Sequence, residues 1–253
     1  MNPRRLWRMV RLASALVECM IRFALKRLQR PLSPVERAMW LQSACRGVLN
    51  SIGISYRIHG TPPSSGLVVS NHLSYLDILF YSAAMPCFFV SKAEVKRWPY
   101  FGAAARAGGT IFLDRGRRAS AAAVVQQMAN RLNLPVPLLL FPEGTSTDGC
   151  AVWRFHSGLF QSAIDTHAPV SAAAIRYIPN DETPESTLCW FGDAGFSSHL
   201  WKTLAASTFT AEIMFGEPVV YGDRRSAAQA TQELVAEMRT LEARPVEAEY
   251  VRN

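Results

Sequence analysis

His72 and Asp77 are the pair of side chains in this sequence best suited to proton transfer. If His72 lies on the turn that enters a helix, Asp77 can accept a hydrogen bond from one imidazole nitrogen and leave the other to take a proton. This arrangement is the His–carboxylate half of a catalytic triad, without a protein nucleophile. Ser74-x-x-Asp77 also fits a helix capping box, a structural role that is compatible with the first.

Two further segments place an ionisable group where an apolar run stops. The Arg115 guanidinium could grip a phosphate with paired hydrogen bonds; the alternative is a solvated loop arginine. The Glu143 carboxylate, between Pro142 and Gly144, could anchor a polyol acceptor; the alternative is a plain turn. Because sites in open α/β sheets gather at the carboxyl ends of strands, we expect both groups to lie near His72.

Other catalytic and metal-binding patterns are absent from the sequence. It contains no GxSxG elbow, HExxH pair, P-loop or GxGxxG fingerprint. The remaining histidines show no metal-ligand spacing, so we expect no metal site; they are His59, His156, His167 and His199. The five cysteines form no CxxC pair, which favours buried thiols in a reducing compartment over disulfides or a zinc finger.

Strand and helix patterns alternate from residue 54 onward. Short apolar runs predict strands at 54–58, 66–70, 87–91, 110–113, 137–141, 170–177, 187–191 and 208–215. Helical patterns cover 75–83, 100–107, 117–133, 158–165, 198–205 and 226–244. The alternation predicts an α/β fold with a mixed, largely parallel sheet flanked by helices. Residues 61–65 are expected to form a turn between neighbouring strands.

Charge is distributed unevenly along the 253 residues. The formal net charge is +7, but residues 1–60 hold 11 Lys and Arg against 2 Asp and Glu, whereas the rest holds 16 against 18. A nucleic-acid-binding domain carries its basic patch on the folded body, so the nearly neutral body argues against that class. The length suits one α/β domain with an appendage.

Residues 6–28 predict a helix that is apolar over most of its surface. Its charged side chains fall within one stripe: Arg8, Arg11, Glu18, Arg22 and Lys26. These charges interrupt every long apolar window, which disfavours a transmembrane span and a secretory signal. We expect the helix to lie in a membrane interface with its arginines toward anionic headgroups; the alternative is a helix buried by the domain.

A second helix is predicted at 34–49, with Ser33 as its N-cap and Pro34 in its first turn. It could form a helical hairpin with the first. The predicted organisation is a basic amphipathic membrane-association segment at 1–50, followed by an α/β domain at 51–253.

Four segments together carry a resemblance to a known enzyme family. In chain order they are Asn71–Asp77, Gly109–Arg115, Phe141–Thr145, and Ala168–Val170 leading to Ile175. Between the first two, Ser91–Glu94 is followed by Pro99–Gly102, which is also similar to a segment of that family. Over roughly residues 50–220, the sequence resembles the 1-acylglycerol-3-phosphate O-acyltransferase (lysophospholipid acyltransferase) family.

The resemblance implies transfer of a fatty acyl group from acyl-CoA or acyl-carrier protein to the hydroxyl of a lyso-lipid. The favoured acceptor is 1-acyl-sn-glycerol-3-phosphate, which gives phosphatidic acid. His72 would be the general base and Asp77 its orienting partner. The residues implied to bind substrate are Lys92, Arg115, Glu143, Gly144 and Thr145.

The resemblance also implies a location and partners. No cofactor is expected to be bound, because the thioester donor is itself a substrate. We expect a monotopic or peripheral protein on the cytoplasmic face of a membrane, the bacterial inner membrane. Its expected partners are anionic membrane lipids, the lyso-lipid acceptor and acyl-carrier protein, with no nucleic acid.

The third motif departs from the form usual for enzymes that act on lysophosphatidic acid. Those usually have Arg after Glu-Gly-Thr, whereas this chain has Ser146. Losing one charge-assisted contact costs about 1.5–3 kcal/mol. This variant resembles lyso-ornithine lipid acyltransferases, so a lyso-lipid without a phosphate is the alternative acceptor. A non-catalytic membrane-surface lipid-binding protein is the alternative from a different class.

Overall fold

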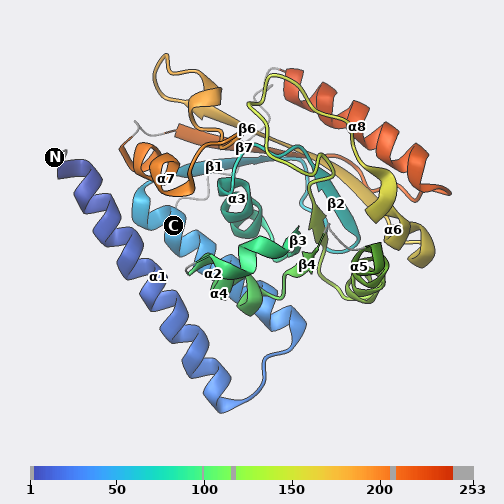
Figure 1. The fold of residues 1–253 in the computed structure, drawn as a ribbon, viewed down its shortest axis with the longest axis horizontal. Coiled ribbons are helices and arrows are strands. Elements are labelled where there is room, and N and C mark those ends of the chain that lie inside the picture. Colours follow the sequence, from blue (N-terminus) through green and yellow to red (C-terminus); the bar gives the residue numbers. More distant parts are fainter. Residues whose placement is uncertain (1–2, 99, 115–117, 206–208, 242–253) are drawn as a thin grey trace.

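A computed structural model describes residues 3–98, 100–114, 118–205 and 209–241 of the chain (Figure 1). Its helices are α1 (Pro3–Gln29), α2 (Pro34–Ile52), α3 (Leu76–Ala84), α4 (Phe101–Gly108), α5 (Arg118–Leu132), α6 (Gln161–Thr166), α7 (Phe196–Ala205) and α8 (Arg224–Thr240). Its strands are β1 (Ser55–His59), β2 (Leu67–Ser70), β3 (Phe88–Lys92), β4 (Ile111–Leu113), β5 (Leu138–Leu140), β6 (Val170–Pro179) and β7 (Phe209–Phe215). Short 3-10 turns are η1 (Ala93–Arg97), η2 (Ser157–Phe160) and η3 (Glu185–Thr187).

The strands form one sheet in the order β1-β7-β6-β2-β5-β3-β4. Neighbouring strands run parallel except β6 and β7, which run antiparallel, so the predicted mixed, largely parallel sheet is confirmed. Residues 61–65 were predicted to form a turn between neighbouring strands, and this prediction was wrong. That segment joins β1 to β2, and β7 and β6 lie between them in the sheet.

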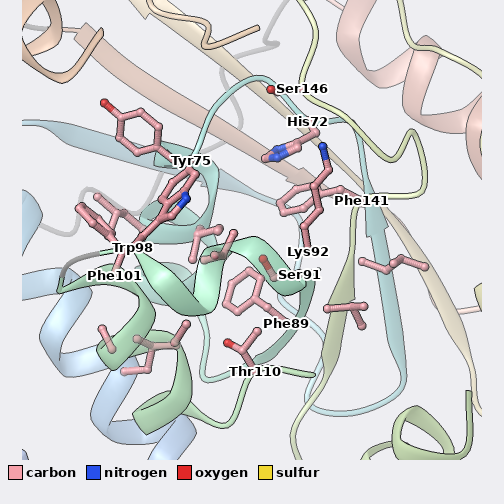
Figure 2. Close-up of a pocket in the computed structure, with 18 of the residues that line it drawn as sticks. His72, Tyr75, Phe89, Ser91, Lys92, Trp98, Phe101, Thr110, Phe141 and Ser146 are labelled. Atoms are coloured by element: carbon pink, nitrogen blue, oxygen red, sulfur yellow. The ribbon is translucent and has the colours of Figure 1, made fainter. Parts of the chain in front are cut away.

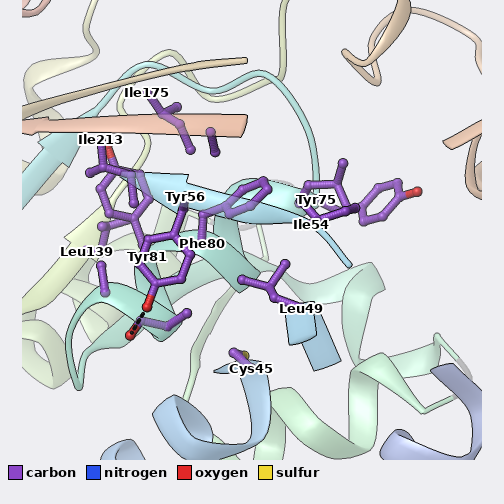
Figure 3. Packing of buried hydrophobic residues seen from close by; sticks show 14 of the residues in the cluster. Cys45, Leu49, Ile54, Tyr56, Tyr75, Phe80, Tyr81, Leu139, Ile175 and Ile213 are labelled. Carbon is purple, nitrogen blue, oxygen red and sulfur yellow. Dashed lines mark hydrogen bonds between the residues drawn. The ribbon is translucent and has the colours of Figure 1, made fainter. Parts of the chain in front are cut away.

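Helices cover both faces of the sheet. One apolar cluster packs α2, α3 and α7 against the face carrying Tyr56, Ile175 and Ile213 (Figure 3). The other packs α5, α6 and α8 against the opposite face, where Leu67 and Val69 point. Successive side chains of a strand alternate between faces, so central strands must be apolar on both sides. All four residues of β2 are buried for this reason.

The N-terminal helices form a hairpin on the outside of the first layer (Figure 1). Ser33 caps α2 through a complete capping box with Glu36, and Gly53 ends the helix with φ +68°. The predicted cap is therefore confirmed. Helix α2 continues to Ile52, two residues beyond the expected boundary at 50, and its Trp40 and Leu49 are part of the core.

Helix α1 is only partly buried by the domain, and its placement in a membrane interface stays a prediction. One face packs on the body: the Phe23 ring lies 4.6 Å from that of Trp40, and buried Arg8 donates to the Leu204 carbonyl of α7. Arg8 thus turns toward the protein, contrary to the expected stripe of headgroup-facing arginines. The other face exposes large apolar side chains: Leu6, Trp7, Val10, Val17, Ile21, Leu25 and Leu28.

One local prediction was wrong, and another was right only in part. Residues 187–191 form no strand; η3 ends at Thr187, and the following chain lies over the loop after β2, where the Trp190 N–H donates to the Leu73 carbonyl at 2.8 Å. The apolar residues Leu188 and Cys189 are buried by that loop instead of by a sheet. The helix predicted at 158–165 begins as the 3-10 turn η2 and becomes α-helical only at Gln161.

Candidate active site

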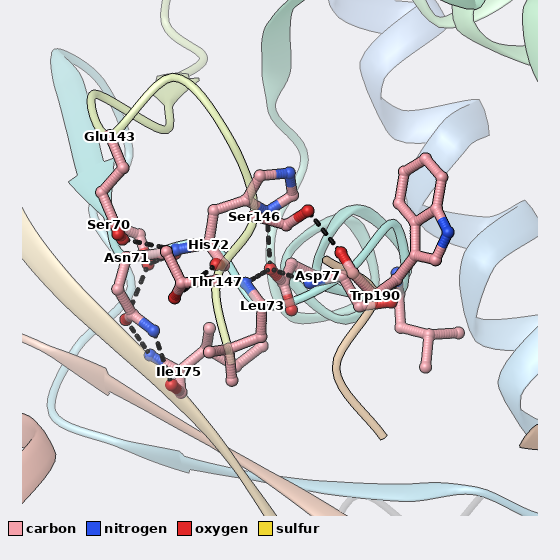
Figure 4. A network of polar contacts seen from close by, with 12 residues as sticks. Ser70, Asn71, His72, Leu73, Asp77, Glu143, Ser146, Thr147, Ile175 and Trp190 are labelled. Carbon is pink, nitrogen blue, oxygen red and sulfur yellow. Dashed lines mark hydrogen bonds and ion pairs between the residues drawn. The ribbon is translucent and has the colours of Figure 1, made fainter. Parts of the chain in front are cut away.

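His72 and Asp77 meet at the end of β2. Helix α3 begins at Leu76, so His72 lies on the turn before the helix and its Nδ1 approaches Asp77 Oδ2 to 2.7 Å (Figure 4). The carboxylate is fully buried and accepts the Nδ1 proton, which assigns the tautomer with a free lone pair on Nε2. The ring is stacked on Phe141 with centroids 4.1 Å apart. The pair is therefore arranged to accept a proton at Nε2.

The same carboxylate holds the turn together. Asp77 Oδ2 accepts from the backbone N–H groups of Leu73 at 2.7 Å and Ser74 at 3.1 Å. The Ser74 hydroxyl accepts from the Leu76 N–H at 3.3 Å, whereas a complete capping box would have it accept from the N–H of Asp77. The acidic half of the predicted capping box is thus present, and it coexists with the contact to His72.

Strand β6, next to β2 in the sheet, supports this turn from the side. The Asn71 side chain forms two hydrogen bonds with the main chain of Ile175, donating to its carbonyl at 3.0 Å and accepting from its N–H at 2.9 Å. Two residues further along β6, the Tyr177 hydroxyl donates to Asp77 Oδ1. The turn is therefore held by a strand about a hundred residues away in the sequence.

Glu143 lies behind His72. Its Oε1 accepts from the His72 N–H at 2.9 Å, and its Oε2 accepts from the Trp153 N–H at 3.1 Å. The side chain is buried, and burial raises the pKa of the Glu143 carboxyl to about 7, against the lowering effect of those two N–H groups. The His72 carbonyl accepts from the Thr147 N–H at 2.9 Å, so the main chain of His72 is held on both sides.

A deep apolar cavity of about 790 Å³ opens beside the imidazole (Figure 2). The cavity wall next to the imidazole includes Phe141, Gly144, Thr145 and Ser146. From there its walls run past Phe89, Phe101 and Ala104 to Leu16 and Met20 of α1 and Trp40, Cys45 and Val48 of α2. A largely apolar cavity of this size next to a proton acceptor suits a long hydrocarbon chain with one reactive end.

Comparisons with known proteins show the family of this chain. The acyltransferase family model matches residues 55–176. Lyso-ornithine lipid O-acyltransferase of Rhodobacter capsulatus is 34% identical over 229 residues, covering 85% of this chain and 82% of that one. The chain belongs to the acyltransferase family.

A second relative and one solved structure are also similar to this acyltransferase. The 1-acyl-sn-glycerol-3-phosphate acyltransferase of Neisseria meningitidis is 34% identical over 175 residues, covering 67% of this chain and 68% of that one. The crystal structure of the 1-acyl-sn-glycerophosphate acyltransferase from Thermotoga maritima shares the fold, with a TM-score of 0.64 and 16% identity over 94% of this chain and all of that one.

The acyltransferase fold brings together most of the residues singled out from the sequence. His72, Lys92, Gly144 and Thr145 line the cavity, whereas Asp77 and Glu143 stand behind its wall. Arg115 lies outside the described residues. The Ser146 hydroxyl, which follows Thr145 in the third motif, donates to the Trp190 carbonyl.

Sequence reasoning missed Tyr177 and the anchoring role of Asn71. A tyrosine inside a buried strand is a signal that its hydroxyl needs a partner. The sequence offered no means of naming Asp77 as that partner.

The described part of the chain shows neither a metal cluster nor a membrane-spanning helix. It contains no group of three or more His, Cys, Asp or Glu that could hold a metal ion. None of its helices combines the length and apolarity that crossing a bilayer requires.

Proposed function

We propose that this acyltransferase moves a fatty acyl group from a thioester donor, acyl-CoA or acyl-carrier protein, to the free hydroxyl of a lyso-lipid. The observation that carries the proposal is the 2.7 Å contact between His72 Nδ1 and Asp77 Oδ2 at the end of the apolar cavity. In this proposal, no covalent acyl-enzyme intermediate is needed, because holding the acceptor hydroxyl beside the thioester supplies the proximity.

The reaction is a single acyl transfer. His72 Nε2 removes the proton of the acceptor hydroxyl while its oxygen attacks the thioester carbonyl carbon. The new C–O bond forms, the C–S bond breaks, and the departing thiolate receives the proton from His72. Asp77 keeps the imidazole oriented and stabilises its positive charge between the two transfers.

The cavity is proposed to hold the acyl chain. Its walls are almost entirely apolar from Phe89 to Met20, and each buried CH₂ group contributes about 0.8 kcal/mol to binding. His72 and Lys92 both line the cavity, and we propose that the thioester and the acceptor meet beside the imidazole.

Lysophosphatidic acid is the acceptor we propose first. Lys92 lies at the cavity wall and can neutralise a phosphate, and Arg115 follows in the sequence. The second candidate is a lyso-lipid without a phosphate, such as lyso-ornithine lipid. The specific observation in its favour is Ser146, which replaces the arginine expected from the resemblance to lysophosphatidate enzymes. The Ser146 hydroxyl donates to the Trp190 carbonyl.

The exposed apolar face of α1 is proposed to bind a membrane. Val17 and Ile21 are more than half exposed, and Arg11 and Lys26 are exposed on the same helix. Such a face enters the headgroup boundary, while basic side chains meet anionic lipids. A lyso-lipid acceptor resides in that boundary, and we propose the cytoplasmic face of the bacterial inner membrane as its location.

The test is release of free thiol from acyl-CoA and acyl-carrier protein across a panel of lyso-lipid acceptors. We expect release with at least one acceptor and its loss in His72→Ala at unchanged thermal stability. His59→Ala, on the edge strand β1, is the matched control and should retain full activity. Thiol release by His72→Ala at the wild-type rate would overturn the mechanism, and lipid binding without release would favour a non-catalytic lipid-binding protein.

A further inference from the structure

The Asp77 side chain has no access to water. It is fully buried, and Oδ2 already accepts from His72 Nδ1, the Leu73 N–H and the Ser74 N–H. A buried carboxylate remains ionised only if donors replace the water that it has lost. Oδ1 faces away from His72. Whether Oδ1 accepts a hydrogen bond therefore also affects how Asp77 and His72 share their protons.

Tyr177 supplies the donor to Oδ1. Its hydroxyl reaches Asp77 from the middle of β6, and its ring is fully buried between Phe80 and Phe209, with centroids 5.7 and 5.5 Å away. Burial, followed by the charge of Asp77, raises the pKa of the phenol well above its ordinary value. The hydroxyl therefore keeps its proton and can serve only as a donor to the carboxylate.

The position of Tyr177 is fixed independently of the catalytic turn. Strand β6 pairs with β2 on one side and with β7 on the other, opposite Ala211 at Tyr177 itself. Two residues earlier, Ile175 holds Asn71 through both main-chain groups. One rigid strand thus positions the residue before His72 and the far oxygen of Asp77.

We propose that Tyr177 is a positioning residue of the acyl-transfer site, which holds Asp77 ionised and oriented so that His72 presents an unprotonated Nε2 to the acceptor. The inference rests on the proposed roles of His72 and Asp77. Tyr177 does not line the cavity, so it acts on the imidazole only through Asp77. Without this hydroxyl, the His72–Asp77 pair would bind a proton more tightly, and the base would be lost at a higher pH.

Other titratable groups surround this pair. The titratable side chains of Glu143, Tyr81, Cys189 and Glu185 interact electrostatically with Asp77 or Tyr177. All of them remain in a variant that lacks only the phenol oxygen. A difference in pH dependence between that variant and the wild type therefore reports the hydroxyl.

The decisive variant is Tyr177→Phe, which keeps the ring and its packing. We expect kcat to fall about 10- to 100-fold, the size of one charge-assisted hydrogen bond, with the KM of donor and acceptor unchanged. The acidic limb of kcat/KM should move upward by about one pH unit. Tyr56→Phe is the matched control, because it removes a buried hydroxyl that donates to the Ala83 carbonyl at 3.2 Å, away from Asp77.

A purely structural tyrosine would give a different result. Tyr177→Phe would then change thermal stability as Tyr56→Phe does and leave kcat and the pH profile at wild-type values, which would overturn the inference. Should Tyr177→Phe fail to fold, 3-fluorotyrosine at position 177 tests it instead. That residue is a stronger donor, so the acidic limb should move to lower pH, and an unmoved limb would refute the role.

The two proposals fail in distinguishable ways. If His72→Ala retains activity, the proposed catalytic base is wrong whatever Tyr177 does. If His72→Ala is inactive while Tyr177→Phe behaves as wild type, the acyl-transfer mechanism stands and only the positioning role of Tyr177 is lost.

Discussion

The backbone N–H of His72 donates to Oε1 of Glu143 at 2.9 Å, which joins the first and third motifs behind the imidazole. Both oxygens of Glu143 are engaged by main-chain groups, because Oε2 accepts from Trp153. The carboxylate therefore fixes the main chain that carries the proposed base. Substrate binding by Glu143 stays a prediction, whereas Gly144 and Thr145 reach the cavity wall directly.

Replacing the orienting carboxylate should separate catalysis from folding. In Asp77→Asn the amide oxygen can take the place of Oδ2, where it still accepts from the Leu73 and Ser74 N–H groups and from His72 Nδ1. The negative charge that stabilises the protonated imidazole is lost. We expect kcat to fall about 10³- to 10⁴-fold, measured by thiol release, with little change in thermal stability. Asp165→Asn, exposed on α6, is the control, and a kcat within tenfold of wild type for Asp77→Asn would contradict the assignment.

Glu143 should make stability depend on pH. Its pKa is raised to about 7 by burial, so its contribution to stability is complete below pH 4.5 and is lost as the pH rises through 7. Relative to Glu143→Gln, the wild type should lose about 3 kcal/mol of unfolding free energy across that window. Urea denaturation at a series of pH values measures this difference.

The control for Glu143 is Thr147→Val, which removes a nearby side-chain contact to the His72 carbonyl without removing a titratable group. The unfolding free energy of Thr147→Val should differ from that of the wild type by the same amount at every pH. If the unfolding free energies of Glu143→Gln and the wild type also differ by a constant amount, Glu143 does not titrate in this range.

A larger side chain in the cavity should shorten the preferred acyl chain. Ala104 of α4 lines the cavity, so Ala104→Leu removes volume along the proposed path of the hydrocarbon. For each methylene that no longer fits, kcat/KM should fall about fourfold, measured over acyl-CoA donors of increasing length. Ala103→Leu, on the same helix but outside the cavity lining, should keep the wild-type preference; an unchanged preference in Ala104→Leu would place the acyl chain elsewhere.

Charges on the exposed face of α1 should weaken membrane binding. Val17 and Ile21 are 51% and 53% exposed, so Val17→Glu and Ile21→Glu leave the packed face intact. Each should lower the partition coefficient to anionic liposomes at least about tenfold, measured by flotation. Ala230→Glu adds the same charge on α8, across the sheet, and should float as the wild type does. Full flotation of the two α1 variants would assign membrane binding to another surface.

The sequence alone was sufficient for the features that depend on near neighbours. The alternation of apolar runs predicted the α/β sheet. The contact between His72 and Asp77 was predicted on the condition that His72 lies on the turn before the helix, and the structure meets that condition. Both features are set by local backbone geometry. The cap of α2 at Ser33 followed from the same kind of local rule.

Only the tertiary structure decided the contacts between distant segments. It placed Tyr177 on Asp77, turned Glu143 toward the His72 main chain, and buried Arg8 against α7. It also used the apolar residues 188–189 to cover a loop where a strand was expected. The pattern of residues indicates that a side chain will be buried or will need a hydrogen-bond partner. Strand order and packing select that partner, and both depend on residues far apart in the chain.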